Sequence, residues 1–313
     1  MDKKNGLRIV GLGHYVPDRI VTNEDLSKIV DTSDEWILSR TGIKQRHYAG
    51  WEKNQDMASA AAKQAIDNSG VDISKIGVCI VATIRPDYLT PSVACMVQKS
   101  LGLPEDIPCF DINAACSGFM YGLFIARGIL MQSDKPYGLV IGSETLSKIL
   151  DMTDRGTCIL FGDGAGAAVI ELCHNRYYSV LGTMGNDEVL VCPNNDGIRH
   201  VHMSGGDVFK FAVGTVPDAI LQILEKAGLT PDDIDLFICH QANKRIIESV
   251  AKKIKQDMKK FYVNVDEYGN TSSASIPIAL SEMKEKGIIK PGMKTICVGF
   301  GGGLTWGGAY IEW

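Results

Sequence analysis

The sequence predicts an α/β fold in which helices pack against mostly parallel sheets. Two observations predict it: short apolar runs alternate with helical patterns along the 313 residues, and this order occurs twice. The two halves match element for element, although few of their residues match. We therefore expect an internal duplication of a β-α-β-α-β-β unit, with residues 145–163 inserted in the first copy. The predicted halves are residues 1–172 and 173–313.

In the first half, apolar and β-branched runs predict four extended segments. Helical patterns follow the first two of them, and Gly102 stands where the first helix should end. The expected strands are 76–84, 109–116, 137–144 and 162–172, and the expected helices are 92–102 and 117–133.

The second half repeats this order. Ile246, Val250 and Ile254 recur every four residues and would line one face of a helix. The expected strands are 234–242, 260–270 (ending in a turn), 294–303 and 304–313, and the expected helices are 243–255 and 273–287. Because ligands of such sheets bind outside the carboxyl ends of the strands, we expect the functional site where these strands end.

The composition excludes several classes of protein. Hydrophobic residues make up 45% of the chain and charged residues 22%, as in soluble globular proteins. No apolar run approaches the roughly 18 residues of a membrane span, and the first residues, MDKKNGLRIVGLG, lack the apolar segment of a signal peptide. A net charge of −5 argues against a general nucleic-acid binder. We expect a cytoplasmic protein with neither a membrane nor a nucleic acid as partner.

Neither the cysteines nor the glycines form a cofactor motif. None of the nine cysteines is spaced as C-x-x-C, so neither a metal site nor a dithiol redox site is expected. Residues 11–16 lack the third glycine of a dinucleotide-binding loop, and residues 161–170 lack the Lys-Ser/Thr pair of a phosphate loop. The glycines of 299–308 allow either a close backbone approach around an anion or tight strand packing.

Cys116 stands where an extended run stops and small residues begin, in DINAACSGF. A cysteine in an apolar segment is usually a packed core residue. Here small neighbours leave room for a substrate, and a helix that begins at Cys116 would favour the thiolate. A thiolate accepts an acyl group from a thioester readily, because one thioester replaces another. Cys116 is therefore the candidate nucleophile.

His240 and Asn270 follow predicted strands of the second half, as Cys116 follows one of the first. Each has an ordinary alternative: a histidine at a strand end is often a structural polar residue, and Gly-Asn is a common turn pair. The three residues together, at matching strand ends, point to a shared site. Because no second cysteine or histidine is evident beside them, we expect His240 and Asn270 to act mainly as hydrogen-bond donors.

Residues 244–260 contain seven basic side chains against two acidic ones. A solvated helix face is the simple explanation. On a chain of net charge −5, the stretch also fits a docking surface for an acidic partner beside His240.

At these residues the sequence resembles the β-ketoacyl-acyl carrier protein synthase III family. The resemblance runs from about Gly6 to Trp313, with motifs in the family's order. These motifs are DTSDEWILSRTGIKQRH, DINAACSGF, DRGTCILFGDGAGAAV, CHQANKRII, EYGNTSSASIP and GFGGGLTWG. The resemblance implies a thiolase-like duplicated α-β-α-β-α fold with two mixed, mostly parallel five-stranded sheets, assembled as a homodimer.

The resemblance also implies the reaction that initiates type II fatty-acid synthesis. A short acyl group would pass from acyl-CoA to Cys116, and malonyl-acyl carrier protein would then lose CO2 and condense with it. His240 and Asn270 would complete the catalytic set, and the backbone N–H groups of Cys116 and Gly302 would form the oxyanion hole. Because acyl-CoA is a substrate, no cofactor is expected. Elongating relatives have a second histidine where Asn270 stands, so the asparagine favours the initiating family.

Further positions carry over from the family's motifs. Trp36 would stack on the adenine of coenzyme A, the arginines would lie near its phosphates, and Phe209 would line the tunnel. The residues implied for coenzyme A are Trp36, Arg40, Arg155, Phe209 and Asn243. Those implied for the carrier protein are Gln241, Ala242, Asn243, Lys244 and Arg245.

One position departs from the family's pattern. Before Pro91, where many members place a phenylalanine that reaches the partner's acyl pocket, this chain has Leu89 and Thr90. We therefore expect a pocket that takes primers longer or more branched than acetyl.

Two other functions stay open at this point. A relative that condenses or transfers acyl groups for polyketide or quinolone-type products would share these motifs. A non-catalytic protein that binds acyl carrier protein should have lost the cysteine or the asparagine, and both are present.

Overall fold

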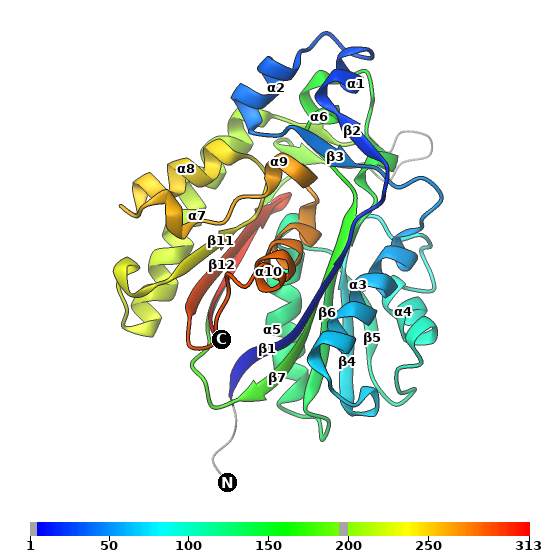
Figure 1. The fold of residues 1–313 in the computed structure, drawn as a ribbon, viewed down its shortest axis with the longest axis vertical. Helices are drawn as coiled ribbons and strands as arrows, with labels where there is room; N and C mark the ends of the chain where they lie inside the picture. The colour runs from blue at the N-terminus through cyan, green and yellow to red at the C-terminus, as the bar shows by residue number, and fades with distance from the viewer. Residues whose placement is uncertain (1–4, 194–199) are drawn as a thin grey trace.

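The computed structural model describes residues 5–193 and 200–313 and confirms the α/β class. Two sheets and three layers of helices alternate, so that α5 and α10 lie between the sheets (Figure 1). Helices α3 and α4 cover the outer face of the first sheet, and α7 and α8 cover that of the second. These helices are α3 (Asn54–Ser69), α4 (Val93–Leu101), α5 (Gly118–Leu130), α7 (Gly205–Ala227), α8 (Lys244–Lys253) and α10 (Ser275–Glu285).

The first sheet has five strands in the order β1-β7-β6-β4-β5. Strand β4 lies inside this sheet between β6 and β5, and its residues IGVCIVA are all buried because helices pack on both faces. The strands are β1 (Gly6–Tyr15), β4 (Ile76–Ala82), β5 (Cys109–Ile112), β6 (Tyr137–Glu144) and β7 (Gly164–Cys173).

The second sheet repeats this topology with the order β11-β12-β13-β8. Strand β8 begins the second half as β1 begins the first. Strands β12 and β13 correspond to β6 and β7. The strands are β8 (Tyr178–Asn186), β11 (Leu236–Cys239), β12 (Lys294–Gly301) and β13 (Gly303–Glu312). The repeated order agrees with an internal duplication, while the exact division at residues 172 and 173 stays a prediction.

The prediction of a fifth strand in the second sheet, at residues 260–270, is wrong. The only bridge of this segment to the second sheet joins Phe237 and Phe261 in the described chain, and the short helix α9 (Val265–Tyr268) follows. The buried Gln241 side chain takes the place of a neighbouring strand: its Nε2 donates to the Tyr262 carbonyl at 3.1 Å, and its Oε1 accepts the Asn264 N–H at 3.0 Å. Backbone groups satisfied by a side chain need no ladder.

The expectation of mostly parallel sheets also needs correction. The pairs β4–β5, β4–β6 and β11–β12 are parallel, whereas β1–β7, β6–β7, β12–β13 and β13–β8 are antiparallel. For β12 and β13 the reason is connectivity: these strands follow each other directly, and such neighbours pair antiparallel.

Local caps set the ends of the helices that lead to the site. The Asp111 carboxylate accepts the N–H groups of Val93 and Ala94 at the start of α4, and Gly102 ends this helix as predicted with φ +65°. Helix α8 begins at Lys244 because the Asn243 side chain accepts the Arg245 N–H at 2.8 Å. These caps fix where the loops before them run.

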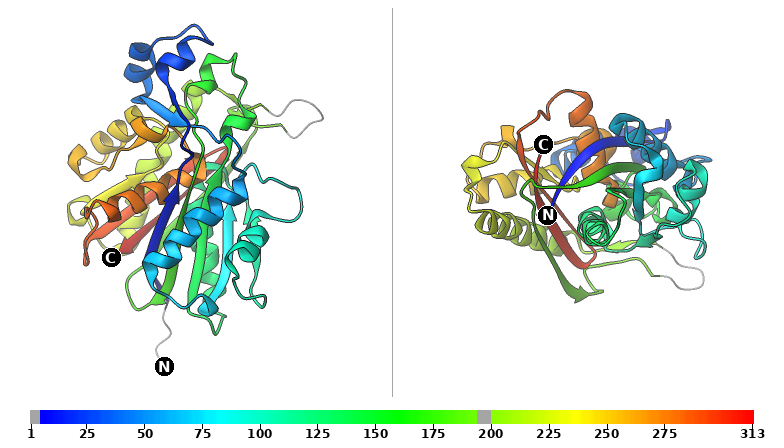
Figure 2. Two further views of the ribbon diagram at one scale, coloured as in Figure 1. Left: turned by 45° about the vertical axis from the view of Figure 1, so that its right-hand side comes forward. Right: turned by 90° about the horizontal axis from the view of Figure 1, so that it is seen from below.

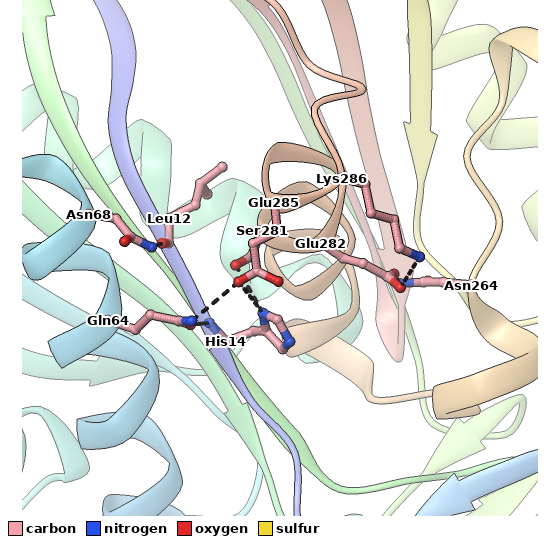
Figure 3. Close-up of polar contacts among 9 residues, drawn as sticks. All are labelled: Leu12, His14, Gln64, Asn68, Asn264, Ser281, Glu282, Glu285 and Lys286. Atoms are coloured by element: carbon pink, nitrogen blue, oxygen red, sulfur yellow. Dashed lines mark hydrogen bonds and ion pairs between the residues drawn. The ribbon is translucent and has the colours of Figure 1, made fainter.

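Strand β1 lies at an edge of the first sheet, and side chains from two helices cover it (Figure 3). From α3, Asn68 donates to the Leu12 carbonyl at 2.9 Å, and Gln64 accepts the His14 N–H at 2.6 Å. From α10, Ser281 Oγ lies 3.0 Å from His14 Nδ1. The covered edge cannot template pairing with another chain.

The smaller elements lie around this core. The segment from β2 to β3 forms a cap at one end of the layers, at the top of Figure 1 and of the left view in Figure 2. The smaller strands and α-helices are β2 (Ile20–Thr22), α1 (Asn23–Ser27), α2 (Asp34–Thr41), β3 (Gln45–His47), α6 (Arg155–Cys158), β9 (Leu190–Val191) and β10 (His202–Met203). The 3-10 turns are Ile73–Lys75, Ala115–Ser117, Leu146–Ile149, Pro231–Asp233, Met258–Lys260 and Ser272–Ala274.

Candidate active site

Cys116 lies in the 3-10 turn between β5 and α5, at the carboxyl end of its sheet. Its side chain is buried at 8% exposure and lines a cavity of about 750 Å³. Phe161, Ser272 and Gly302 line the same cavity, so residues from both halves of the chain meet there. Of its small neighbours, Ala114 and Ala115 line this cavity, as the sequence predicts, whereas Ser117 and Gly118 do not.

The backbone around Cys116 is strained and closely packed. Ala115 has φ +46° and Ser272 has φ +50°, which is left-handed backbone that non-glycine residues rarely adopt and that occurs often at functional sites. A Cβ at Gly301 would lie 2.6 Å from the Cys116 nitrogen. The glycines at the end of β12 therefore allow tight packing against the Cys116 turn, which was one of the two alternatives, and an anion pocket in this segment stays a prediction.

His240 follows β11 and is buried at 1% exposure. Its Nδ1 lies 2.6 Å from Ser275 Oγ, and this oxygen also accepts the Gln241 N–H at 3.3 Å. That second contact favours the Ser275 hydroxyl as donor to Nδ1, which leaves the ring proton on Nε2. Burial lowers the pKa of His240 to about 3, so the ring is neutral.

Asn270 is buried at 7% exposure, and its N–H donates to the Leu160 carbonyl at 2.8 Å. Its Oδ1 accepts the Ser272 N–H at 2.9 Å, which leaves the amide NH2 available as a donor. Ser272 lies beside Cys116 in the same cavity and lowers the pKa of its thiol, and Ser275 Oγ lies within hydrogen-bond distance of His240 Nδ1. The segment 270–275 therefore connects the three predicted catalytic residues.

The thiol of Cys116 does not behave as the sequence predicts. Burial raises its pKa to about 12, Ser272 lowers it, and the nearby Glu144 charge raises it further. The expected lowering by a helix N-terminus is outweighed, because a buried sulfur loses the water that would stabilise a thiolate. In the resting protein Cys116 is a thiol.

The sequence analysis missed Glu144, Ser272 and Ser273. Glu144 is fully buried at the end of β6, and its Oε1 accepts both serine hydroxyls, at 3.1 Å from Ser272 and 2.8 Å from Ser273. The signal was available, since Glu144 ends a predicted strand of the same sheet as the strand before Cys116.

The residues implied for coenzyme A form a second group near the surface. The guanidinium carbons of Arg155 and Arg40 lie 4.7 Å and 5.2 Å from the centre of the Trp36 ring. Asn243 Nδ2 donates to the Arg40 carbonyl at 3.0 Å. The Arg245 guanidinium lies 5.7 Å from the ring centre of Phe209, the last of the five. None of these residues lines the cavity at Cys116.

The residues implied for the carrier protein and the acyl pocket differ in their exposure. Lys244 and Arg245 are exposed, and Ala242 and Asn243 are half-buried. Gln241, however, is 1% exposed and bonded to backbone groups, so it is not available as a surface contact. Leu89 is 91% exposed, and neither it nor the exposed Thr90 borders the Cys116 cavity of this chain.

Neither a metal-binding cluster nor a membrane-spanning helix is present in residues 5–193 and 200–313. They contain no group of three or more His, Cys, Asp or Glu side chains arranged to hold a metal ion. The helices in these ranges are too short or too polar to cross a membrane.

Comparisons with known proteins agree with the geometry. A family model described as 3-oxoacyl-[acyl-carrier-protein (ACP)] synthase III matches residues 110–187, and one described as its C-terminal part matches residues 224–313. The β-ketoacyl-[acyl-carrier-protein] synthase III of Clostridium acetobutylicum is 47% identical over 323 aligned positions that cover 99% of each chain.

Solved structures give the same result. The crystal structure of 3-oxoacyl-[acyl-carrier-protein] synthase III from Aquifex aeolicus VF5 is 42% identical with a TM-score of 0.94, covering 98% of this chain and 100% of that one. The priming β-ketosynthase from the R1128 polyketide biosynthetic pathway is 32% identical with a TM-score of 0.93, covering 100% and 97%.

Fold and site together define a thiolase-like condensing enzyme, which is an acyltransferase. The chain belongs to the β-ketoacyl-[acyl-carrier-protein] synthase III family. The family and the fold class expected from the sequence are thereby confirmed.

Proposed function

We propose that the protein initiates fatty-acid synthesis by transferring a short acyl group from acyl-CoA to Cys116 and condensing it with malonyl-acyl carrier protein. The observation that carries this proposal is the junction at 270–275, where Ser272 contacts Cys116 and Asn270 while Ser275 holds His240. The products are 3-oxoacyl-acyl carrier protein, coenzyme A and CO2.

In the first step the Cys116 sulfur attacks the thioester carbonyl of acyl-CoA. The bond from carbon to Cys116 forms, the bond to the coenzyme A sulfur breaks, and the thiol proton ends on the departing sulfur. No net proton enters or leaves, so a thiol with a raised pKa suffices if its proton moves as the substrate arrives. The N–H groups of Cys116 and Gly302 are our candidates for stabilising the tetrahedral oxyanion.

In the second step malonyl-acyl carrier protein loses CO2, and the electron pair of the broken bond becomes an enolate. Donors from His240 Nε2 and the Asn270 amide would stabilise the enolate oxygen, so no strong base is required. The enolate carbon then attacks the acyl group on Cys116, the bond from that carbon to the sulfur breaks, and the sulfur leaves as a thiolate that takes a proton from water. A neutral, buried His240 suits the role of a donor.

The remaining partners follow from the surface groups. We infer that Trp36, Arg40 and Arg155 hold the nucleotide end of coenzyme A, and that Asn243 and Phe209 contact the chain that leads to Cys116. The exposed Lys244 and Arg245, with Ala242 and Asn243 beside them, fit an acidic carrier protein. These roles are proposed because the residues lie near one another and because several of them are basic. Neither step requires a cofactor.

We further propose a cytoplasmic homodimer. Strand β5 is an edge of the first sheet, and its four residues are half-buried, so a partner's strand could pair there. The exposed Leu89 and Thr90 would then reach the partner's acyl cavity. Light scattering tests the dimer, and a competition among acetyl-, isobutyryl- and longer acyl-CoA tests the pocket; a strict preference for acetyl would contradict our reading of Leu89 and Thr90.

Mass spectrometry after mixing the protein with acyl-CoA tests the proposal. An acyl adduct on the Cys116 peptide is expected, and the Cys116→Ser variant should carry none. No adduct with any acyl-CoA in the panel would refute the transfer step.

A second candidate function rests on a specific likeness. The priming β-ketosynthase of a polyketide pathway matches the whole chain with a TM-score of 0.93, so the same chemistry could serve secondary metabolism. The fatty-acid function ranks first because the relatives at 47% identity are named β-ketoacyl-[acyl-carrier-protein] synthase III, the family whose resemblance implies the reaction that initiates fatty-acid synthesis. Turnover with the organism's fatty-acid carrier protein against its polyketide carrier proteins distinguishes the two.

A further inference from the structure

Glu144 is a buried carboxyl group that the proposed mechanism does not use. It lies at the carboxyl end of β6 with 0% exposure. Its hydrogen-bond partners among the described residues are all neutral: Ile84 N at 3.1 Å, Thr83 Oγ1 at 3.2 Å and the hydroxyls of Ser272 and Ser273. Burial without a cation raises the pKa of Glu144 to about 7.

Ser272 joins this carboxyl group to the candidate nucleophile. Its hydroxyl lies 3.1 Å from Glu144 Oε1 and also contacts Cys116. A serine hydroxyl has one proton, so it can donate to the carboxylate or to the sulfur but not to both. The Asn270 side chain and a left-handed backbone hold Ser272 between the two groups.

We propose that Glu144 is a positioning residue for Cys116, which it controls through the direction of the Ser272 hydroxyl. When Glu144 is ionised, it accepts the hydroxyl proton, and the serine oxygen turns a lone pair toward Cys116, which suits a thiol. When Glu144 is protonated, it donates to a serine itself, and the Ser272 proton is free to stabilise a thiolate. The inference rests on the proposed role of Cys116 as the nucleophile.

The groups that face Glu144 leave this competition undisturbed. Thr83 and Ile84 come directly after β4, and Ser272 and Ser273 lie in the turn before α10. None of these groups titrates near neutral pH. The Cys116 thiol is the titratable group in the described chain whose pKa responds to the Glu144 charge. Protonation of Glu144 therefore affects Cys116 without the titration of another group between them.

The Glu144→Gln variant should keep the Ser272 hydroxyl in the arrangement that protonated Glu144 produces. Its amide oxygen can keep the Ile84 and Thr83 donors, while its NH2 donates to the serines and frees the Ser272 hydroxyl for Cys116. The assay is the alkylation rate of Cys116 by iodoacetamide, followed on its peptide by mass spectrometry, which needs no acyl substrate. At pH 9 we expect the variant to react about tenfold faster, equivalent to about one unit in the thiol pKa. At pH 6 the two rates should converge, because Glu144 is then protonated in the wild type as well.

Two controls separate this proposal from simpler effects. Asp163→Asn removes another buried carboxylate, which binds Ala49 and Ser147 instead, and should leave the Cys116 profile unchanged. In a Ser272→Ala background, Glu144→Gln should accelerate alkylation much less than tenfold, leaving only the effect of the lost charge. If the tenfold effect persists without the Ser272 hydroxyl, or if Asp163→Asn produces it too, the proposal is overturned.

The wild type alone supplies a second measurement if the Glu144→Gln variant does not fold. Coupling to Glu144 predicts a plot of log rate against pH with a slope below one between about pH 6 and 8. A slope of one throughout would overturn the proposal. Absence of acylation by every acyl-CoA, with this coupling intact, would instead refute the proposed function.

Discussion

Replacing Ser275 with alanine tests how the protein orients the His240 ring. The ring is buried, and Ser275 Oγ is its Nδ1 partner at 2.6 Å. Without the hydroxyl, Nδ1 becomes a buried group without a partner, and the proton is no longer fixed on Nε2. Leaving a buried polar group unsatisfied costs about 1–3 kcal/mol. About 2 kcal/mol lost from the donor in the decarboxylation transition state corresponds to about 30-fold in rate.

The assay compares two steps in the same variant. Release of CO2 from malonyl-acyl carrier protein should fall about 30-fold, whereas acylation of Cys116 by acyl-CoA should change little. Ser281→Ala is the matched control, since Ser281 lies on the same helix and contacts a histidine Nδ1 at 3.0 Å, that of His14, away from the cavity. Equal losses in both steps, or a comparable loss in the control, would show that Ser275 does not act by fixing the His240 tautomer.

Three further predictions follow from the same geometry. Asn270→Ala should lower malonyl decarboxylation by about 10²–10³-fold and leave measurable Cys116 acylation; abolished acylation with normal CO2 release would reverse our assignment. Gly301→Ala should abolish acylation, because its Cβ would lie 2.6 Å from the Cys116 nitrogen, whereas Gly214→Ala on α7 meets nothing within 4 Å and should stay active; equal activity of the two variants would contradict this. Burial lowers the pKa of His240 from 6.5 to about 3. As the pH falls, His240 is therefore protonated in the unfolded chain before it is protonated in the folded chain. The contribution of neutral His240 to stability is present above pH 6.5 and is lost toward pH 3. Urea unfolding should therefore show a steeper loss of stability between pH 6.5 and 4 in the wild type than in His240→Gln, and parallel curves would refute it.

The sequence predicted much of the architecture because its signals are local. Apolar runs marked β4, β6, β12 and β13, and the spacing of Ile246, Val250 and Ile254 marked the buried face of α8. Gly102 ended its helix where expected, since only a left-handed residue makes that cap without strain.

The errors arose where a distant group competed with a local preference. Residues 260–270 have strand-like composition, but the Gln241 amide binds the Tyr262 carbonyl and the Asn264 N–H, and one bridge at Phe261 joins the segment to the second sheet. The same contact buries Gln241, which the sequence placed on the docking surface. Neither outcome can be read from residues some twenty positions apart.

The sequence by itself determined which residue types stand at the ends of the strands, and therefore the candidates Cys116, His240 and Asn270. Only the tertiary structure decided their states: the depth of burial makes Cys116 a thiol and His240 neutral, and places a shared serine between the sulfur and Glu144. The physical reason is that strand patterns depend on near neighbours, whereas the protonation of a side chain depends on water excluded by the whole fold.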